Sequence, residues 1–487
     1  MPLIRLVFLF SMKVKIEKLV FGGQGLCRAE GKIVFVWGGL PGEEVEIKII
    51  KKKKNFIEGV VEKVLVSSPD RIAPLDDHYL SCSPWQTMSY EKENEWKKVI
   101  AEETYRRICP DFAMAQNRGS SITTRGRNRE NLNLEVVAPK KEIGYRNKME
   151  YNFSELLLQP TARPLPALSS AEARVQRPSL PPQRRESERG LSLAFHDRGT
   201  HWLRPIDRCT LGSEIIQNAS EEIVDNLRMK KIPFSILKSL IVRSDDSGKA
   251  AAALFVKDMD FCRKGWQTPP NLPLERGGSL KGLQIYYSNP QSPASVATEL
   301  LSSEGDSELM CELSGVKLKF GLMSFFQINP PIFVEALKVI GKHIDGGRVV
   351  DYYSGVGAIS LALHGKYDSA LLIEENQEAS DFANENILLN KFDNVTVQNI
   401  MAEASNVEIG ENDIVILDPP RAGLHTDMIK HLLKKLPRKI IYLSCGLDTH
   451  ARDVSYLSVR YRPVEWKLFN FFPRTPHIEG LCILEKI

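Results

Sequence analysis

The carboxy-terminal third of the chain alternates apolar strand-like runs with helix-like runs, and this alternation restricts the fold more than any other feature. From residue 331 onward, runs such as RVVDYYS, ALLIEEN, DIVILDPP and KIIYLSC are linked by helical patterns. Repeated strand–helix units predict a parallel, doubly wound α/β sheet over residues 321–487, with ligands outside the carboxyl ends of the strands. The chemistry is therefore expected directly after Tyr353, Glu374, Asp418 and Cys445.

The preceding residues predict two β-rich units. Residues 12–67 carry short strand-like runs at roughly ten-residue spacing, separated by glycine turns, which is typical of a small β-barrel. Residues 68–320 contain further strand-like runs and predict a second, mostly β, domain. Two stretches within it, at about 113–140 and 159–190, are rich in Arg, Ser, Pro and Gln, and we expect flexible insertions there. Residues 1–11 are expected to be a disordered extension or the product of a misassigned start codon.

Composition excludes several classes of protein. The 487 residues include 65 basic and 61 acidic side chains, a balance too even to diagnose nucleic-acid binding from net charge. The eight cysteines form no C-x-x-C pair, so no zinc ribbon or other metal site is predicted, and scattered thiols fit a reducing cytosol. The apolar patch from Leu6 to Phe10 is too short to span a membrane. We therefore expect a cytoplasmic protein that binds no membrane.

A glycine turn and an acidic residue mark a candidate nucleotide site. Gly355-Val356-Gly357 follows an apolar strand and opens a helix, so the backbone there can approach a ligand closely. Glu374, nineteen positions after the first glycine, is placed to hold ribose hydroxyls of a nicotinamide cofactor or of S-adenosylmethionine. The plainer interpretation is a tight turn beside a solvated glutamate. Ser360 replaces the third glycine of the dinucleotide motif, which disfavours nicotinamide.

Three residues farther along carry the candidate chemistry. Asp418 precedes two prolines, which end the strand and hold its carboxylate at the strand tip. Cys445 ends the next strand just before a helix, a position where a thiolate can meet a substrate, although a buried inert thiol is the ordinary reading of a single cysteine. Glu479 lies in a polar island among aromatic residues, where a raised pKa would suit proton abstraction; a plain loop carboxylate is the alternative.

Five motifs in this order resemble the RNA (uracil-5-)-methyltransferase family. The stretch Tyr145–Glu150 is similar to the central-domain signature of that family. Residues 12–67 resemble the TRAM domain, an RNA-binding barrel, and point to the 23S ribosomal RNA branch; the run Lys51–Lys54 and Arg28 would line one face of it. The five motifs are Phe326-Gln327-Ile328-Asn329, Asp351–Gly357, Asp418–Gly423, Ser444-Cys445 with Ala451-Arg452-Asp453, and His477-Ile478-Glu479.

The resemblance implies an S-adenosylmethionine-dependent enzyme that methylates carbon 5 of uracil in RNA. Cys445 matches the nucleophile that adds to carbon 6 of uracil, and Glu479 matches the base that removes the proton from carbon 5. The residues matched to the methyl donor are Gln327, Tyr353, Glu374 and Asp418. The target uracil would have to leave its stack. Candidates for stacking against it are Phe325, Phe326 and Phe471. We expect ribosomal RNA as the partner and a monomeric protein.

The sequence departs from the family at two places that bear on cofactors. Many relatives bind an iron–sulfur cluster through four cysteines, whereas here only Cys82 and Cys209 occupy matching positions and Trp85 stands where a third cysteine would lie. Two thiols cannot ligate a four-iron cluster, so we expect none unless Cys109 joins them. Met401 stands where relatives carry an acidic or amide residue near the adenine site.

Two alternatives remain open beside the ribosomal RNA enzyme. A transfer-RNA uracil-5 methyltransferase would use the same chemistry, but such relatives usually lack the amino-terminal barrel. A catalytically silent RNA-binding protein would account for the insertions and the missing cysteines. The joint presence of Cys445 and Glu479 argues against that second alternative.

Overall fold

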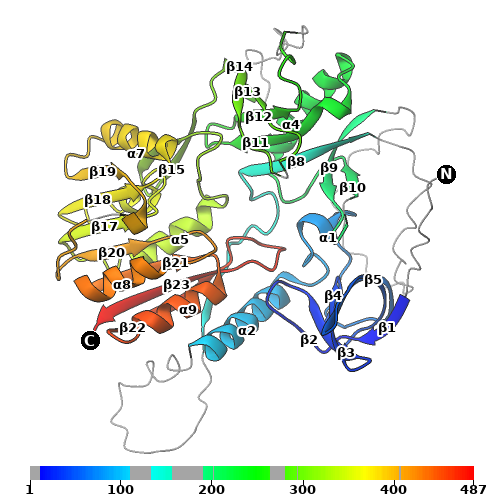
Figure 1. Cartoon of the computed structure of the whole chain (residues 1–487), viewed down its shortest axis with the longest axis horizontal. Coiled ribbons are helices and arrows are strands. Elements are labelled where there is room, and N and C mark those ends of the chain that lie inside the picture. Colours follow the sequence, from blue (N-terminus) through cyan, green and yellow to red (C-terminus); the bar gives the residue numbers. More distant parts are fainter. Residues whose placement is uncertain are drawn as a thin grey trace, which may run out of the picture.

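The computed structural model describes residues 11–109, 133–155, 190–200, 202–263, 280–292, 294–404 and 407–487. Residues 1–10 of the expected extension and most of the two expected insertions lie outside the described residues. The chain forms an amino-terminal barrel, a central β-rich part and a carboxy-terminal α/β part, which lie around a common centre (Figure 1). Within the described residues, no helix is long and apolar enough to cross a membrane.

The barrel is one curled sheet with the strand order β1-β5-β6-β4-β3-β2. Val34, Val36, Val45 and Ile47 point into its interior, because alternate residues of a strand face the same side. The expected small β-barrel is confirmed, and it begins at Ser11, the last residue of the expected disordered extension. Its strands are β1 (Ser11–Lys15), β2 (Lys18–Leu19), β3 (Gly25–Ala29), β4 (Lys32–Trp37), β5 (Glu44–Lys52) and β6 (Phe56–Val66).

The central part is built on a seven-stranded sheet with the order β10-β9-β8-β11-β12-β13-β14. Helix α4 (Glu214–Met229) covers one face with the apolar stripe Ile216, Ile223 and Leu227. The opposite face contributes Ile241 and Phe255 to the core of the carboxy-terminal part. The strands are β8 (Lys148–Glu155), β9 (Leu191–His196), β10 (Leu203–Ile206), β11 (Leu237–Ser244), β12 (Ala250–Val256), β13 (Leu280–Tyr287) and β14 (Glu299–Gly305). A hairpin of β15 (Leu309–Leu313) and β16 (Val316–Phe320) leads out of this part.

The carboxy-terminal part is an eight-stranded sheet with the order β19-β18-β17-β20-β21-β23-β22-β7. The first five strands in this order are parallel to one another, as predicted. They are β17 (Arg348–Tyr352), β18 (Ser369–Glu374), β19 (Val395–Asn399), β20 (Ile414–Leu417) and β21 (Lys439–Ser444). The remaining strands are β22 (Tyr461–Phe469), β23 (Glu479–Lys486) and β7 (Glu135–Val137), and β23 runs antiparallel to β21. The sheet is therefore mixed, not wholly parallel.

Helices cover both faces of this sheet, which confirms the doubly wound architecture. On one face lie α5 (Pro330–Ile340), α6 (Ala358–Ala362) and α7 (Gln377–Asn390). On the other lie α8 (Thr426–Lys435), α9 (Leu447–Leu457) and α2 (Tyr90–Ile108).

Two elements depart from the expected domain boundaries. Helix α2 was expected in the central domain, yet Ala101 and Tyr105 pack in the core formed by α9 and the α/β sheet. Strand β7 lies in the stretch 113–140 that was predicted to be a flexible insertion, yet it pairs with β22 at the edge of the same sheet. The short run Glu135–Val137 has no periodicity of its own, and its order comes from pairing with a neighbouring strand, which local composition does not reveal.

A buried ion pair fastens α2 to the segment between β22 and β23. Lys97 Nζ lies 2.8 Å from Glu93 Oε1 and donates to Asn470 Oδ1 at 2.6 Å, and both charged side chains are fully buried. Glu93 also accepts the backbone N–H of Arg474 at 2.9 Å. Because each charge is met by hydrogen bonds, the pair holds residues 470–474 in one conformation.

Replacing Glu93 by Gln should destabilise the protein, because the buried Lys97 ammonium would lose its counter-charge. We expect the free energy of unfolding in urea to fall by about 3 kcal/mol. The matched control is Glu95→Gln, on the exposed face of the same helix, which should leave the unfolding curve close to that of the wild type. Equal curves for the two variants would show that the buried pair contributes nothing to stability.

Candidate active site

The antiparallel pairing of β21 with β23 sets the position of the two expected catalytic residues. Ser444, the last residue of β21, pairs with Gly480. Cys445 follows Ser444 and Glu479 precedes Gly480, so the next position of the register places these two residues opposite each other. Directly opposed residues of an antiparallel pair have Cβ atoms about 5 Å apart. Glu479 is therefore the first residue of a strand, not part of a polar island in a loop.

The environment of the Cys445 thiol is dominated by burial and by carboxylates. Burial raises the pKa of Cys445 to about 11, and the neighbouring Glu479 and Asp418 add to this rise. The Arg421 guanidinium acts in the opposite direction and lowers the pKa of the same thiol. Free of ligands, Cys445 is consequently a protonated thiol at neutral pH, and Arg421 is the nearby group that favours its thiolate.

The two carboxyl groups facing Cys445 also have raised pKa values. Burial, followed by the charge of Asp418, raises the pKa of Glu479 well above its ordinary value. Burial and the charge of Asp351 raise the pKa of Asp418. Like charges in one enclosed site disfavour joint ionisation, so the ionisation of either acid opposes that of the other.

The glycine turn and the expected ribose ligand are joined directly. Glu374 lies at the carboxyl end of β18, and its Oε2 accepts the backbone N–H of Gly355 at 2.9 Å. Tyr353 has a positive φ of 62° and donates its hydroxyl to Glu403 at 2.9 Å. Gly357 opens α6 with φ of 86°, and a Cβ atom there would lie 2.7 Å from Leu361 Cδ1, so a side chain is excluded. The half-buried Glu374 carboxylate thus lies at the edge of this backbone turn.

Ser360, which stands at the third glycine position of the dinucleotide motif, forms a buried hydrogen bond. Its hydroxyl donates to Asp351 Oδ2 at 2.6 Å, and both residues are fully buried. Burial raises the pKa of Asp351 to about 7. The serine therefore stabilises a buried acid below the turn, and this arrangement does not follow the three-glycine pattern of a nicotinamide site.

Gln327 is held between two parts of the molecule. Its backbone carbonyl accepts the Asn147 side-chain amide at 3.0 Å, and the Asn147 backbone N–H donates to Ile328. Asn147 belongs to the segment Tyr145–Glu150 that resembles the family's central-domain signature. The two motifs, far apart in sequence, are thus hydrogen-bonded to each other.

Arg243 is a supporting residue that sequence reasoning missed. It lies on β11, is fully buried, and donates to the carbonyls of Gly321 and Ser324 at 2.9 and 2.6 Å. Its guanidinium also covers the ring of Phe320 at 4.8 Å. The sequence does contain a clue to this role, namely a lone arginine in an apolar strand. A charged side chain in a buried strand requires hydrogen-bond partners. The residue fixes the loop that leads to Gln327.

The side chains proposed to stack against a base differ in accessibility. Phe325 is 68% exposed, whereas Phe326 and Phe471 are buried. Phe326 stacks on Phe320 with ring centroids 4.1 Å apart, and Phe471 belongs to the apolar core. Phe325 is therefore the candidate of the three that can meet a ligand without unfolding the core. Met401, at the adenine side of the expected site, is 54% exposed.

The residues present do not fit a four-iron cluster. Cys82 and Cys209 come together, with sulfurs 3.6 Å apart, but Trp85 is buried and donates its indole N–H to the carbonyl of Gly23. Cys109 lies in the core of the α/β part, near Cys482, and not beside Cys82. Two thiolates are half the number that such a cluster requires.

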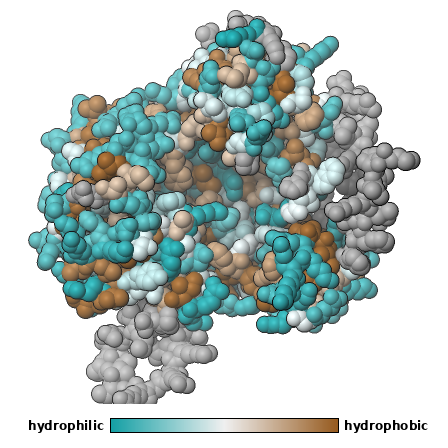
Figure 2. All heavy atoms as spheres, in the orientation of Figure 1, coloured by the Kyte–Doolittle hydropathy of each residue, from teal (hydrophilic) through white to brown (hydrophobic). Residues whose placement is uncertain are grey.

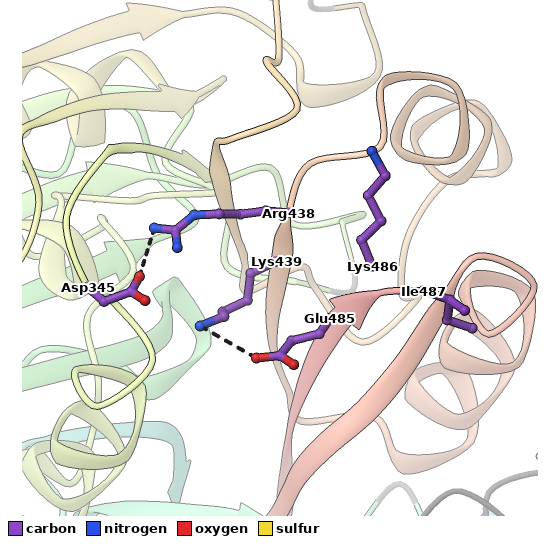
Figure 3. A pocket seen from close by; sticks show the side chains of 6 residues that line it. All are labelled: Asp345, Arg438, Lys439, Glu485, Lys486 and Ile487. Carbon is purple, nitrogen blue, oxygen red and sulfur yellow. Dashed lines mark ion pairs between the residues drawn. The ribbon is translucent and has the colours of Figure 1, made fainter.

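The surface has a recess where the three parts meet (Figure 2). The segment between β22 and β23, drawn red in Figure 1, extends toward this centre. A separate hollow, shown in Figure 3, lies at the opposite edge of the sheet, where β21 begins and β23 ends. Its charged side chains are already paired, Arg438 with Asp345 at 2.7 Å and Lys439 with Glu485 at 3.8 Å. Because ligands of doubly wound sheets bind at the carboxyl ends of the parallel strands, this second hollow is not the candidate active site.

Comparison with known proteins agrees with these observations. Residues 316–487 match the family model described as tRNA (Uracil-5-)-methyltransferase, and residues 11–61 match the TRAM domain. A protein of Porphyromonas gingivalis, described as an uncharacterized RNA methyltransferase, is 26% identical over 97% of this chain and 99% of its own length. A protein of Caldanaerobacter subterraneus with the same description is 27% identical over 97% of this chain and 98% of its own length.

A solved structure shares the fold over nearly the whole chain. The crystal structure of Pyrococcus abyssi tRNA (uracil-54, C5)-methyltransferase in complex with S-adenosyl-L-homocysteine superposes with a TM-score of 0.70. It is 21% identical and covers 97% of this chain and 100% of its own. Together with the ordered motifs, the two matches indicate an RNA methyltransferase: residues 316–487 are similar to the tRNA (Uracil-5-)-methyltransferase family, and residues 11–61 are similar to the TRAM domain.

Proposed function

We propose that this protein methylates carbon 5 of uracil in RNA through a covalent bond between Cys445 and carbon 6 of the base. The observation that supports this most is the register of β21 and β23, which sets the thiol opposite the Glu479 carboxyl. A nucleophile and a base are both needed because carbon 5 of uracil is itself a poor nucleophile. A silent RNA-binding protein would have no use for this pairing.

The proposed reaction has three steps: addition of sulfur, transfer of the methyl group and elimination. The Cys445 thiolate adds to carbon 6, and the electrons of the 5,6 double bond move into an enolate. Carbon 5 of the enolate then forms a bond to a methyl group, which leaves its donor. Glu479, as carboxylate, removes the proton that remains on carbon 5, and the sulfur departs as the double bond re-forms. The product is 5-methyluracil, and the thiolate is regenerated.

The methyl donor proposed for this reaction is S-adenosylmethionine, which supplies an electrophilic methyl group when bound. The residues at the carboxyl ends of the strands fit it. Glu374, already hydrogen-bonded to the Gly355 turn, would accept hydrogen bonds from ribose hydroxyls. Gln327, Tyr353 and Asp418 would complete the donor site. Asp418 would in addition hold the uracil beside Cys445, since it adjoins that thiol.

RNA is expected to contact the barrel and the exposed aromatic residue. Lys51–Lys54 are all exposed at the end of β5 and in the turn after it, where they can neutralise phosphates. Arg28 pairs instead with Glu17 at 3.1 Å, which leaves it less able to do so. Phe325 would stack against the extruded uracil or its neighbour.

Ribosomal RNA remains the substrate that we propose, and the protein is expected to act as a monomer in the cytoplasm. Transfer RNA is the second candidate, for a specific reason. The Pyrococcus abyssi structure, titled as a tRNA enzyme, covers 97% of this chain, a share that has to include most of the barrel. The barrel therefore does not discriminate between the two substrates.

Incubation with radiolabelled S-adenosylmethionine tests the activity and the substrate together. We expect 5-methyluridine in unmodified ribosomal RNA, identified after digestion by chromatography against a standard. Label in transfer RNA alone would assign the second substrate. Label at cytosine or adenine, or in neither RNA, would contradict the proposed function.

Substitution of the two catalytic residues should give different products, because they act at different stages. Cys445→Ala should abolish both methylation and any RNA adduct. Glu479→Gln should still attack and methylate, but elimination should stall, so a protein–RNA adduct that resists denaturant accumulates on a gel. The matched control is Glu485→Gln on the same strand, which should turn over normally. An adduct with the Cys445 variant, or normal turnover of the Glu479 variant, would remove that residue from its role.

The reactivity of Cys445 should rise steeply with pH. Since burial places its pKa at about 11, the thiolate fraction below that pH increases about tenfold per unit. Alkylation of Cys445 by iodoacetamide, read by peptide mass spectrometry, should follow this slope between about pH 7 and pH 10.

Arg421→Gln should slow this alkylation severalfold at each pH, because it removes the charge that lowers the pKa of the thiol. The control Arg460→Gln, at an exposed site, should match the wild type. A pH-independent rate in the wild type would show that the thiol is already ionised at neutral pH.

A further inference from the structure

Four side chains with metal-binding atoms meet outside the candidate active site. They are Asp76 and His78, which precede helix α1 (Tyr79–Cys82), Cys82 at its end, and Cys209 after β10. One ligand atom of each lies within 4.8 Å of all the others, and three of the four residues are buried. The sequence alone predicted no metal site, because the spacing D-x-H-x3-C followed by a distant cysteine matches no common zinc motif.

His78 supplies the observation that points to a ligand. Its ring is 2% exposed, and Nε2 is buried with no hydrogen-bond partner. Nε2 faces the cluster, 4.0 Å from Asp76 Oδ2. The other ring nitrogen, Nδ1, lies 3.2 Å from Asp77 Oδ1. A carboxylate on one imidazole nitrogen, with the second nitrogen free and directed at thiols, is the usual arrangement around a metal-bound histidine.

The spacing of the remaining donors suits a tetrahedral ion. The Cys82 and Cys209 sulfurs are 3.6 Å apart. Two thiolates on one zinc ion at about 2.3 Å each would be separated by about 3.8 Å. A disulfide requires about 2.05 Å between sulfurs and would leave His78 Nε2 without a partner.

Asp76 is oriented by a second layer of hydrogen bonds. Its Oδ2 accepts from Gln86 Nε2 at 2.8 Å and from the Thr210 hydroxyl at 2.6 Å. The backbone N–H of Thr210 is also shared between Oδ1 and Oδ2, at 3.2 and 3.3 Å. A carboxylate has about four acceptor sites, so these three donors leave one site for an ion. Ligating carboxylates are commonly hydrogen-bonded in this way.

We propose that Asp76, His78, Cys82 and Cys209 bind a single divalent transition-metal ion, zinc by preference, in place of an iron–sulfur cluster. One imidazole, one carboxylate and two thiolates form a closed tetrahedral set, which is typical of structural zinc and excludes a substrate from the ion. Binding would release the thiol protons. The ion would join the α1 segment to the central sheet, and Trp85, three residues after Cys82, donates its backbone N–H to the carbonyl of Arg474 at 3.2 Å. The ion would therefore stabilise the support of the loop that ends at Glu479.

Metal analysis of the full-length protein tests this site without any methylation assay. Protein prepared under reducing conditions without chelator should contain about one zinc per chain by elemental mass spectrometry. After exchange with Co²⁺, it should show the intense visible bands of a tetrahedral site and a thiolate-to-cobalt charge-transfer band. Absence of metal, stoichiometric iron with acid-labile sulfide, or a Cys82–Cys209 disulfide in this preparation would each overturn the proposal.

Two sets of variants locate the ion. Cys82→Ser and Cys209→Ser should each lower zinc content at least tenfold, whereas Cys262→Ser, at another half-buried cysteine, should retain it. Asp77→Asn changes an exposed side chain that supports His78, so folding should survive while zinc affinity, measured by competition with a chelating dye, falls about 10- to 100-fold. Asp70→Asn is its control. Unchanged affinity in Asp77→Asn together with full zinc content in both cysteine variants would place the metal elsewhere.

Discussion

The antiparallel return of β23 along β21 is the constraint on which the rest of the site depends. In a wholly parallel sheet, every residue at the carboxyl edge of the sheet follows the last residue of a strand. Here β23 enters the sheet at that edge, so its first residue, Glu479, meets the residue that follows the last strand position, Cys445. The proposed nucleophile and the proposed base thus come from strands of opposite direction, and a shift of one residue in register would turn Glu479 to the opposite face.

This register is maintained by contacts from all three parts of the molecule. The buried Glu93–Lys97 pair fixes residues 470–474, and Tyr145 of the central part donates its hydroxyl to Pro473 at 3.0 Å. The barrel approaches the same loop, since a Cβ atom at Gly23 would clash with the ring of Pro476. A loop of nine residues, 470–478, would otherwise sample many conformations, and each of these contacts removes some of that freedom. The barrel and the central part therefore hold in place the loop that leads to Glu479.

Much of the fold and of the candidate site could be predicted from the sequence. The features that the sequence did not predict share one physical cause. The strand–helix alternation predicted β17 to β21 and the positions of Glu374, Asp418 and Cys445, because each depends on local periodicity and on breakers such as the two prolines after Asp418. The membership of α2 and β7 in the sheet, the role of Arg243 and the cluster at His78 depend on contacts between segments far apart in sequence. Cys82 and Cys209 are 127 positions apart, and no local pattern indicates that they meet.

The candidate site combines three acids, the buried Asp351 and Glu479 and the half-buried Asp418, with an exposed arginine, Arg421. Burial raises the pKa values of Asp351, Asp418 and Glu479, so the unliganded site carries less negative charge than three carboxylates would suggest. A neutral Glu479 opposes thiolate formation at Cys445 less than a charged one does. As the proposed base, however, the same residue has to lose its own proton before it can remove the one on carbon 5. In the proposed reaction, forming the carbon–sulfur bond would consume the thiolate before Glu479 acts as base on the proton of carbon 5, so the two groups would not have to be ionised side by side.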